Sequence, residues 1–342
     1  MHRSKSKWLL PILAMMFVVL VNAKTLAKEP IIDMHLHAFA ATHYGPQATA
    51  HCISDVIPAA SERAEPFAAT WQRQLTEPLC DEPVWSPASD ALLMQETIQA
   101  MEKHNIFGVA SGTAEYVARY MNAAPDRIYP GISFDSVSEQ VTAEKLRHLH
   151  AEGRLDVLGE LGFQYSGIEP SDPAVQPYWQ LANELDIPVA IHIGTGPPGA
   201  VYIGSPEYRA RLHSPLVLEE TLVKYPELRV QIMHAGYPML DDLLAVLYTH
   251  PQVYIDVGVI IWLLPREEFY RYLKTIVSAG YGSRVMFGSD QMIWPGVIEH
   301  SIRIIEEAPF LNAAQKRNIF YHNAARFLRL SDDEIARHHN AG

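Results

Sequence analysis

Short apolar runs alternate with helical patterns along most of the chain. Eight of these runs are continuously apolar, which is typical of strands that are buried on both faces of a parallel sheet. The predicted strands are Ile31–His35, Phe107–Ala110, Ile128–Ile132, Val157–Leu161, Val189–Ile193, Val230–Met233, Val253–Val257 and Val285–Phe287.

Between the strands, apolar residues recur at helical spacing. Ser89 has a side chain suited to an N-cap, and Met94, Ile98 and Met101 then follow at spacings of four and three. Further helices are predicted over Tyr178–Leu185, Leu216–Tyr225, Leu240–Tyr248 and Glu267–Ser278, around Ile304, and over Ala313–Leu328. The alternation predicts an α/β fold, specifically a (β/α)8 TIM barrel, with a doubly wound open sheet as the alternative.

One interval breaks this rhythm. Residues 38–88 separate the first strand from its helix, where a few residues would normally suffice. Because strand-to-helix connections lie on the active-site face of a barrel, we interpret this insertion as a lid, with a surface loop as the alternative. The barrel is predicted over residues 28–330, followed by a C-terminal tail over 331–342.

The N-terminus has the pattern of an export signal. Three basic residues precede Trp8–Val21, an apolar run of 14 residues that is shorter than the ~20 of a transmembrane helix. A small-residue cleavage site follows. We predict a signal peptide over residues 1–23, with cleavage as late as residue 27, and a periplasmic or secreted protein. An uncleaved membrane anchor is the alternative. In an oxidising compartment, Cys52 and Cys80 are predicted to form a disulfide.

Composition narrows the class of protein. The 342 residues are 48% hydrophobic and 19% charged, which is typical of a globular protein. The net charge of −12 becomes −15 once residues 1–23, with three basic residues and no acidic ones, are removed. This acidic balance disfavours a nucleic-acid partner. Two cysteines are too few for a thiolate metal site. Histidine is abundant, with 16 residues, so its placement matters most.

Metal-binding side chains end five of the predicted strands. His35 and His37 end the first strand and, two residues apart, share one of its faces. Glu160, His192, His234 and Asp290 end four later strands. Because these ends converge on one cup in a barrel, the six residues predict a nitrogen and oxygen metal site. Such ligands suit zinc, and also manganese, iron or nickel.

Other polar residues carry weaker signals. His148 and His150 are also two apart, but they lie in a helical pattern and are predicted to be surface residues. Asp256 ends the seventh strand and could orient a ligand or cap the strand. Arg209 and Arg211, in a loop with two tyrosines, could bind an anionic substrate group or lie in solvent.

These residues together resemble the amidohydrolase superfamily, specifically its amidohydrolase-related ("amidohydrolase 2") branch. The resemblance spans Pro30 to Leu330 and is carried by Ile32–His37, Ile187–His192, Tyr225–Leu228, His234–Pro238, Phe287–Asp290 and Asn323–Phe327. It implies a metal-dependent barrel in which His35, His37, His192 and Asp290 bind the metal and His234 is an acid/base residue or a ligand. Glu160 resembles the carboxylate that two metals share in TatD-like nucleases, so one or two ions are expected.

The predicted signal peptide and the resemblance together indicate an exported hydrolase acting on a small molecule. A metal-bound hydroxide is expected to attack an ester, lactone or amide carbonyl, with Asp290 and His234 transferring protons. The alternatives are a non-oxidative decarboxylase, with Arg209 or Arg211 holding the substrate carboxylate, and a phosphoester hydrolase with two metals. A non-catalytic periplasmic metal- or ligand-binding protein is the alternative outside enzymes. A homo-oligomer is left open.

Overall fold

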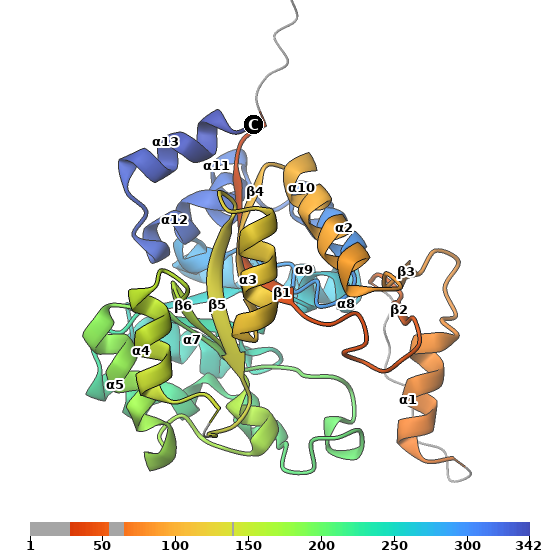
Figure 1. Cartoon of the computed structure of the whole chain (residues 1–342), viewed down its shortest axis with the longest axis horizontal. Coiled ribbons are helices and arrows are strands. Elements are labelled where there is room, and N and C mark those ends of the chain that lie inside the picture. The colour runs from red at the N-terminus through yellow and green to blue at the C-terminus, as the bar shows by residue number, and fades with distance from the viewer. Residues whose placement is uncertain (1–27, 55–64, 139) are drawn as a thin grey trace, which may run out of the picture.

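A computed structural model describes residues 28–54, 65–138 and 140–342. The predicted signal peptide lies outside the described residues. Eight parallel strands form a nearly closed barrel, with the strand order β1-β4-β5-β6-β7-β8-β9-β10 (Figure 1). The barrel strands are β1 (Ile31–Ala38), β4 (Ile106–Gly112), β5 (Ile128–Phe134), β6 (Val157–Leu161), β7 (Val189–His192), β8 (Val230–Met233), β9 (Val253–Asp256) and β10 (Val285–Met286). Both the TIM barrel and the eight predicted strands are confirmed.

Residues after the last strand continue the barrel wall beside the first. Met34 N donates to Phe287 O at 2.9 Å, and Asp290 N donates to His35 O at 2.7 Å. The segment that carries Asp290 is therefore fixed directly against the strand that carries the two first histidines.

Helices cover the outside of the barrel (Figure 1). Ser89 is the N-cap of α2 (Asp90–Lys103), as predicted, and its side chain accepts a hydrogen bond from Leu92 N. These helices are α2 (Asp90–Lys103), α3 (Ala114–Ala123), α4 (Ala143–Ala151), α5 (Gln176–Leu185), α6 (Glu219–Lys224), α7 (Leu240–Thr249), α8 (Ile260–Leu263), α9 (Arg266–Ile276), α10 (Gly296–Glu306), α11 (Ala313–Arg317) and α12 (Asn323–Leu328). None of the helices in the described ranges combines the length and the apolar character needed to cross a membrane.

The insertion after β1 has its own small elements. A two-stranded antiparallel pair, β2 (Ala50–His51) and β3 (Val84–Trp85), accompanies α1 (Phe67–Thr76), and the group extends to one side of the barrel (Figure 1). Cys52 and Cys80 form a disulfide within it, as predicted.

The insertion packs on the segment that follows the last barrel strand. The ring of His51 meets that of Trp294 edge to face at 4.4 Å, and Trp294 Nε1 donates to Thr49 O at 2.9 Å. The insertion is thereby joined to the loop that begins with Asp290. Its role as a lid stays a prediction.

The residues that we expected to form a tail contain a further helix. The helix α13 (Asp332–Asn340) begins with a capping box, in which Ser331 and Glu334 satisfy each other's backbone donors. It packs beside the start of β1, where Asn105 Nδ2 donates to Lys28 O at 2.9 Å and to His338 O at 3.3 Å. The backbone at Gly342 abuts Lys28. Both ends of the described chain thus meet at the face opposite the cup.

Candidate metal centre

The strand β1 presents two imidazoles to the same pair of carboxylates. His37 Nε2 lies 3.0 Å from Asp290 Oδ1 and 3.2 Å from Glu160 Oε2. His35 Nε2 lies 3.5 Å from each of the same two oxygens. Gln291 fixes the backbone here, because its side chain accepts from His37 N at 2.9 Å and donates to His37 O at 2.7 Å. Alternation along β1 and this backbone clamp together aim both rings into the cup.

A third imidazole, that of His234, lies near both carboxylates, Glu160 and Asp290. Its Nε2 lies 3.7 Å from Glu160 Oε1, and its Nδ1 lies 3.8 Å from Asp290 Oδ2. The same Nδ1 contacts Gly258 O at 3.0 Å, which assigns the hydrogen to Nδ1 in the neutral ring. Both His234 and Asp290 have positive φ, 57° and 49°, a conformation that residues other than glycine rarely adopt. Such strain is concentrated at functional sites in proteins.

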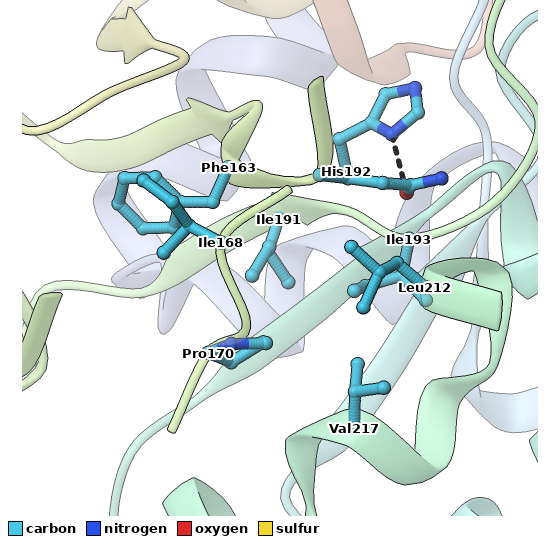
Figure 2. Close-up of a pocket in the computed structure, with 9 residues that line it drawn as sticks. Phe163, Ile168, Pro170, Ile191, His192, Ile193, Leu212 and Val217 are labelled. Atoms are coloured by element: carbon cyan, nitrogen blue, oxygen red, sulfur yellow. Dashed lines mark hydrogen bonds between the residues drawn. The ribbon is translucent and has the colours of Figure 1, made fainter. Parts of the chain in front are cut away.

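The ring of His192 is held by two residues of the turn after β6. Gln164 Oε1 lies 3.0 Å from His192 Nδ1, and the hydroxyl of Tyr165 lies 3.0 Å from Nε2. Figure 2 shows the ring turned away from Ile191 and Ile193, which line an apolar pocket on the other side of the strand. The alternation of side chains along β7 therefore separates the barrel wall from the cup.

Asp256 lies beneath the site and is fully buried. Its Oδ1 lies 3.2 Å from His35 Nδ1 and accepts from Gly258 N at 2.6 Å, while Oδ2 accepts from Gln231 Nε2 at 2.7 Å. A carboxylate on Nδ1 leaves Nε2 of His35 free to face the cup. This arrangement supports the interpretation of Asp256 as an orienting residue.

The carboxylates of the site face imidazoles, and these groups shift one another's pKa values. Burial raises the pKa of Glu160, but the adjacent imidazoles of His234, His35 and His37 outweigh it and hold that pKa well below its ordinary value. Burial likewise opposes ionisation of Asp290, and the charges of His35 and His37 reverse the effect and lower its pKa. Burial, with the nearby charge of His234, lowers the pKa of His192 to about 3. His192 is thus neutral, which is the form that binds a metal.

Several buried polar atoms in the cup have no hydrogen-bond partner within the described residues. They include His35 Nε2, His234 Nε2 and Asp290 Oδ1. Buried polar atoms nearly always have partners, so these three indicate a missing ligand. Three overlapping groups have ligand atoms within 4.8 Å of one another, and they are His35 with His234 and Asp290, His35 with His37 and Glu160, and Glu160 with His192 and His234. Imidazole and carboxylate donors at this spacing fit a divalent transition metal.

The structure brings all six predicted metal-site residues to one cup. His148 and His150, the other two histidines that are two residues apart, lie elsewhere. His148 is exposed on α4 beside Glu152, and His150 bonds to the Leu155 carbonyl. Arg209 donates to the carbonyls of Pro206 and Tyr208, and Arg211 forms an exposed ion pair with Glu169 at 2.6 Å. Neither arginine contacts the six residues.

Three residues near the cup were not predicted from the sequence. Gln164 and Tyr165 lie in a short 3-10 turn, Phe163–Ser166, which has no periodic signal. Asp135 follows β5 directly, and the rule that found the other strand-end residues applies to it as well. It was missed because the predicted strand ended at Ile132, whereas the strand continues to Phe134.

One protein-family model matches most of the chain. A family model described as "Amidohydrolase" matches residues 32–330. No curated protein sequence matches the chain. A probable 2-pyrone-4,6-dicarboxylic acid hydrolase from Acinetobacter baumannii, solved with citric acid bound, has a TM-score of 0.56 at 17% identity, over 88% of this chain and 99% of its own.

Two further solved structures are similar to a comparable degree. The 4-oxalomesaconate hydratase of Rhodopseudomonas palustris has a TM-score of 0.55 at 16% identity, covering 87% of this chain and 95% of its own. A 2,6-dihydroxybenzoate decarboxylase from Rhizobium has a TM-score of 0.53 at 14% identity, covering 88% and 99% respectively. At these identities the structural likeness shows the fold.

Proposed function

The chain belongs to the amidohydrolase family of metal-dependent enzymes, and we propose that it hydrolyses an ester, lactone or amide of a small substrate. One observation carries this proposal. Buried nitrogen and oxygen atoms without partners converge in the cup from β1, from the end of β8 and from the segment after β10. The proposal makes His35, His37, His192 and Asp290 the metal ligands, with Glu160 available for a second ion.

A bound divalent ion supplies a Lewis acid that polarises a carbonyl and lowers the pKa of water. Zinc is the proposed metal, because imidazole and carboxylate are among its usual ligands. Glu160 belongs to two of the three candidate groups, which supports a second ion beside the first.

Asp290 and His234 are proposed to move the protons. Asp290 accepts the proton of the attacking water and returns it to the leaving group, which balances the hydrolysis. His234 keeps its Nδ1 hydrogen on the Gly258 carbonyl at 3.0 Å, so the proton that it holds or releases is on Nε2, the nitrogen that faces Glu160. The ring of His192 is fixed by Gln164 and stays neutral.

Decarboxylation is the second candidate, because the solved structures that are similar to this chain include decarboxylases. That reaction calls for a cation to hold the substrate carboxylate. Arg209 and Arg211 were the candidates, and both are engaged outside the cup. Hydrolysis of a carbonyl compound is therefore the better-supported proposal.

We also propose that the protein acts after export. The disulfide between Cys52 and Cys80 supports an oxidising compartment. Mass spectrometry of the protein from fractionated cells tests this proposal. A mature N-terminus between residues 24 and 28 in the periplasm or medium is expected, and an intact leader in the cytoplasm contradicts it.

Metal analysis combined with a hydrolysis screen tests the main proposal. The protein loaded with zinc should hydrolyse members of a panel of esters, lactones and amides, and the metal-free protein should not. His192→Ala should lose metal and activity while staying folded. His148→Ala, which changes an exposed histidine, serves as the matched control. Full activity without metal contradicts the proposal, and two ions per chain assign Glu160 as a ligand.

A further inference from the structure

An additional carboxylate lies at the rim of the cup, at the end of β5. Asp135 follows Phe134, which pairs with Leu161 of the neighbouring strand β6. This register places Asp135 beside Gly162, and its Oδ1 occupies the place where a Cβ of residue 162 would lie. The ring of Tyr165 is 3.1 Å from the same position. Asp135 therefore lies between the end of β6 and the tyrosine whose hydroxyl contacts His192.

The neighbours of Asp135 include groups of the cup. Its pKa responds to the charges of Glu160 and His37, and its own charge raises the pKa of the Tyr44 and Tyr165 hydroxyls. These groups come from β1, from the insertion, from β6 and from the turn that follows β6. The residue as a whole is exposed, so it lies at the rim of the cup, although its carboxylate is partly shielded from water.

Within the described residues, only the charge of His37 acts against the negative charge of Asp135, and burial and Glu160 outweigh it. The carboxylate of Asp135 forms no hydrogen bond or ion pair with the described residues, whereas Asp290 and Glu160 face imidazoles. Lost hydration first, and the negative charge of Glu160 second, raise its pKa to about 6. The fold therefore does little to stabilise the negative charge of Asp135. A substrate group that enters through the mouth of the cup can bind to this carboxylate.

The charges of the neighbouring residues determine whether a cationic or an anionic substrate group binds to Asp135. In residues 28–54, 65–138 and 140–342, no lysine or arginine forms an ion pair with Glu160, Asp290 or Asp135. The rim therefore offers a negative charge that no lysine or arginine of these ranges pairs with. A cationic group on a substrate is attracted there and an anionic group is repelled.

We propose that Asp135 is a specificity-determining residue that selects substrates bearing a protonated amine beyond the scissile ester, lactone or amide bond. This assignment rests on the proposed function, since it names the substrate class of the same site. Asp135 acts on binding and takes no part in proton transfer. The ammonium donates to the carboxylate at the rim, while the carbonyl lies deeper, among the six residues of the metal centre.

Three matched aryl acetates test the assignment. They are the acetate esters of 4-(aminomethyl)phenol, 4-ethylphenol and 4-hydroxyphenylacetic acid, which carry a cationic, a neutral and an anionic group at one position. The zinc-loaded protein should give the highest kcat/KM for the cationic ester and the lowest for the anionic one. In Asp135→Asn, the ratio of the cationic to the neutral ester should fall about tenfold.

The control variant lies at the other end of the same strand. Asp126→Asn removes an equal charge from an exposed position just before β5, at the opposite face of the barrel, and should leave the ratio unchanged. The ratio is measured on one sample, so partial unfolding of a variant cancels from it. An equal fall in both variants overturns the assignment, because it shows a general charge effect. Highest kcat/KM for the anionic ester also overturns it.

A binding measurement separates this assignment from the proposed hydrolysis. Calorimetry with 4-(aminomethyl)benzohydroxamate, 4-ethylbenzohydroxamate and 4-(carboxymethyl)benzohydroxamate requires no turnover. If the cationic hydroxamate binds most tightly and this preference is lost in Asp135→Asn, the assignment is supported. This holds even if no ester is hydrolysed, and in that case only the proposed function fails. Ester hydrolysis without any charge preference overturns the assignment and leaves the proposed function intact.

Discussion

Individual side chains of the site were predictable where a strand supplied them. His35, His37 and His192 lie within strands, and His234 follows β8 directly. Asp290 lies four residues after β10, in the segment that is bonded to β1. The residues that orient them were less predictable. Gln164 contacts His192 across 28 positions of sequence, from a turn whose path no periodic pattern specifies. Contacts of that kind depend on the packing of the whole cup.

Gln164 offers a test of how the orienting residues affect the metal. Gln164→Leu keeps a similar volume at a buried position but removes the oxygen that holds His192 Nδ1. We expect zinc affinity to fall about 10- to 100-fold, because residues that orient ligands have effects of this size. Chelator competition measures the affinity. Gln180→Leu, on the exposed face of α5, is the control, and equal affinities in the two variants contradict the expectation.

Among the elements, barrel strands were predicted well and the C-terminal helix was not. Continuous apolar runs identified all eight strands because both strand faces are buried. The helix α13 is mostly polar and has one buried residue, His338, so its apolar pattern is faint. Its capping box, Ser331 with Glu334, was the signal that the sequence did contain.

His338 should make the docking of α13 sensitive to acid. Its ring stacks on Phe107 at 3.6 Å, and its nitrogens lie 3.0 Å from the hydroxyls of Tyr129 and Tyr321. Burial lowers the pKa of His338 to about 4 from 6.5. The unfolded chain therefore binds more protons between these values, and the stability that neutral His338 contributes, complete above about pH 6.5, is lost as the pH falls towards 4.

The comparison of His338→Gln with the wild-type protein measures this effect. The difference in free energy of unfolding between the two proteins should be largest near neutral pH and should shrink towards pH 4. Denaturant titrations at several pH values provide it. Growth of the difference on acidification contradicts the assignment of a neutral ring. His148→Gln, at an exposed site, should show no such trend.

The disulfide is the covalent constraint of the insertion. Cys52 and Cys80 are separated by 28 positions, and a closed loop of this length contributes about 3–4 kcal/mol in the chain-entropy account. The Cys52→Ser, Cys80→Ser double variant should lose up to that amount from the free energy of unfolding. Adding a reductant should destabilise the wild-type protein similarly and leave the double variant unaffected. No difference between the two proteins contradicts a stabilising role.

On the scale of the whole molecule, the barrel joins residues that are far apart in sequence into one metal centre. Candidate ligands run from His35 to Asp290, so an ion bound there bridges strands from both ends of the chain. The sequence predicted this arrangement because the order of the strands around a barrel follows their order in the chain. It did not predict how the insertion packs, since Trp294 and Thr49 meet through long-range contacts.

Metal removal should therefore lower the stability of the entire fold. An ion that binds only the folded protein adds about 2.7 kcal/mol at a concentration 100 times its dissociation constant. We expect a higher Tm with zinc than with a chelator, and little zinc-dependent change in His192→Ala. Differential scanning calorimetry with circular dichroism measures both. An equal Tm with and without zinc contradicts a metal that links the strands.

The closeness of Lys28 and Gly342 determines how the enzyme can be tethered. Both residues lie at the face where the barrel strands begin, whereas the reacting groups lie where the strands end. A linker attached at either position leads away from the mouth of the cup. Immobilisation on a bead, or fusion to a scaffold, through either position should therefore leave the mouth open to incoming molecules. A short peptide that joins the two positions would also permit circular permutants with new ends in an outer loop.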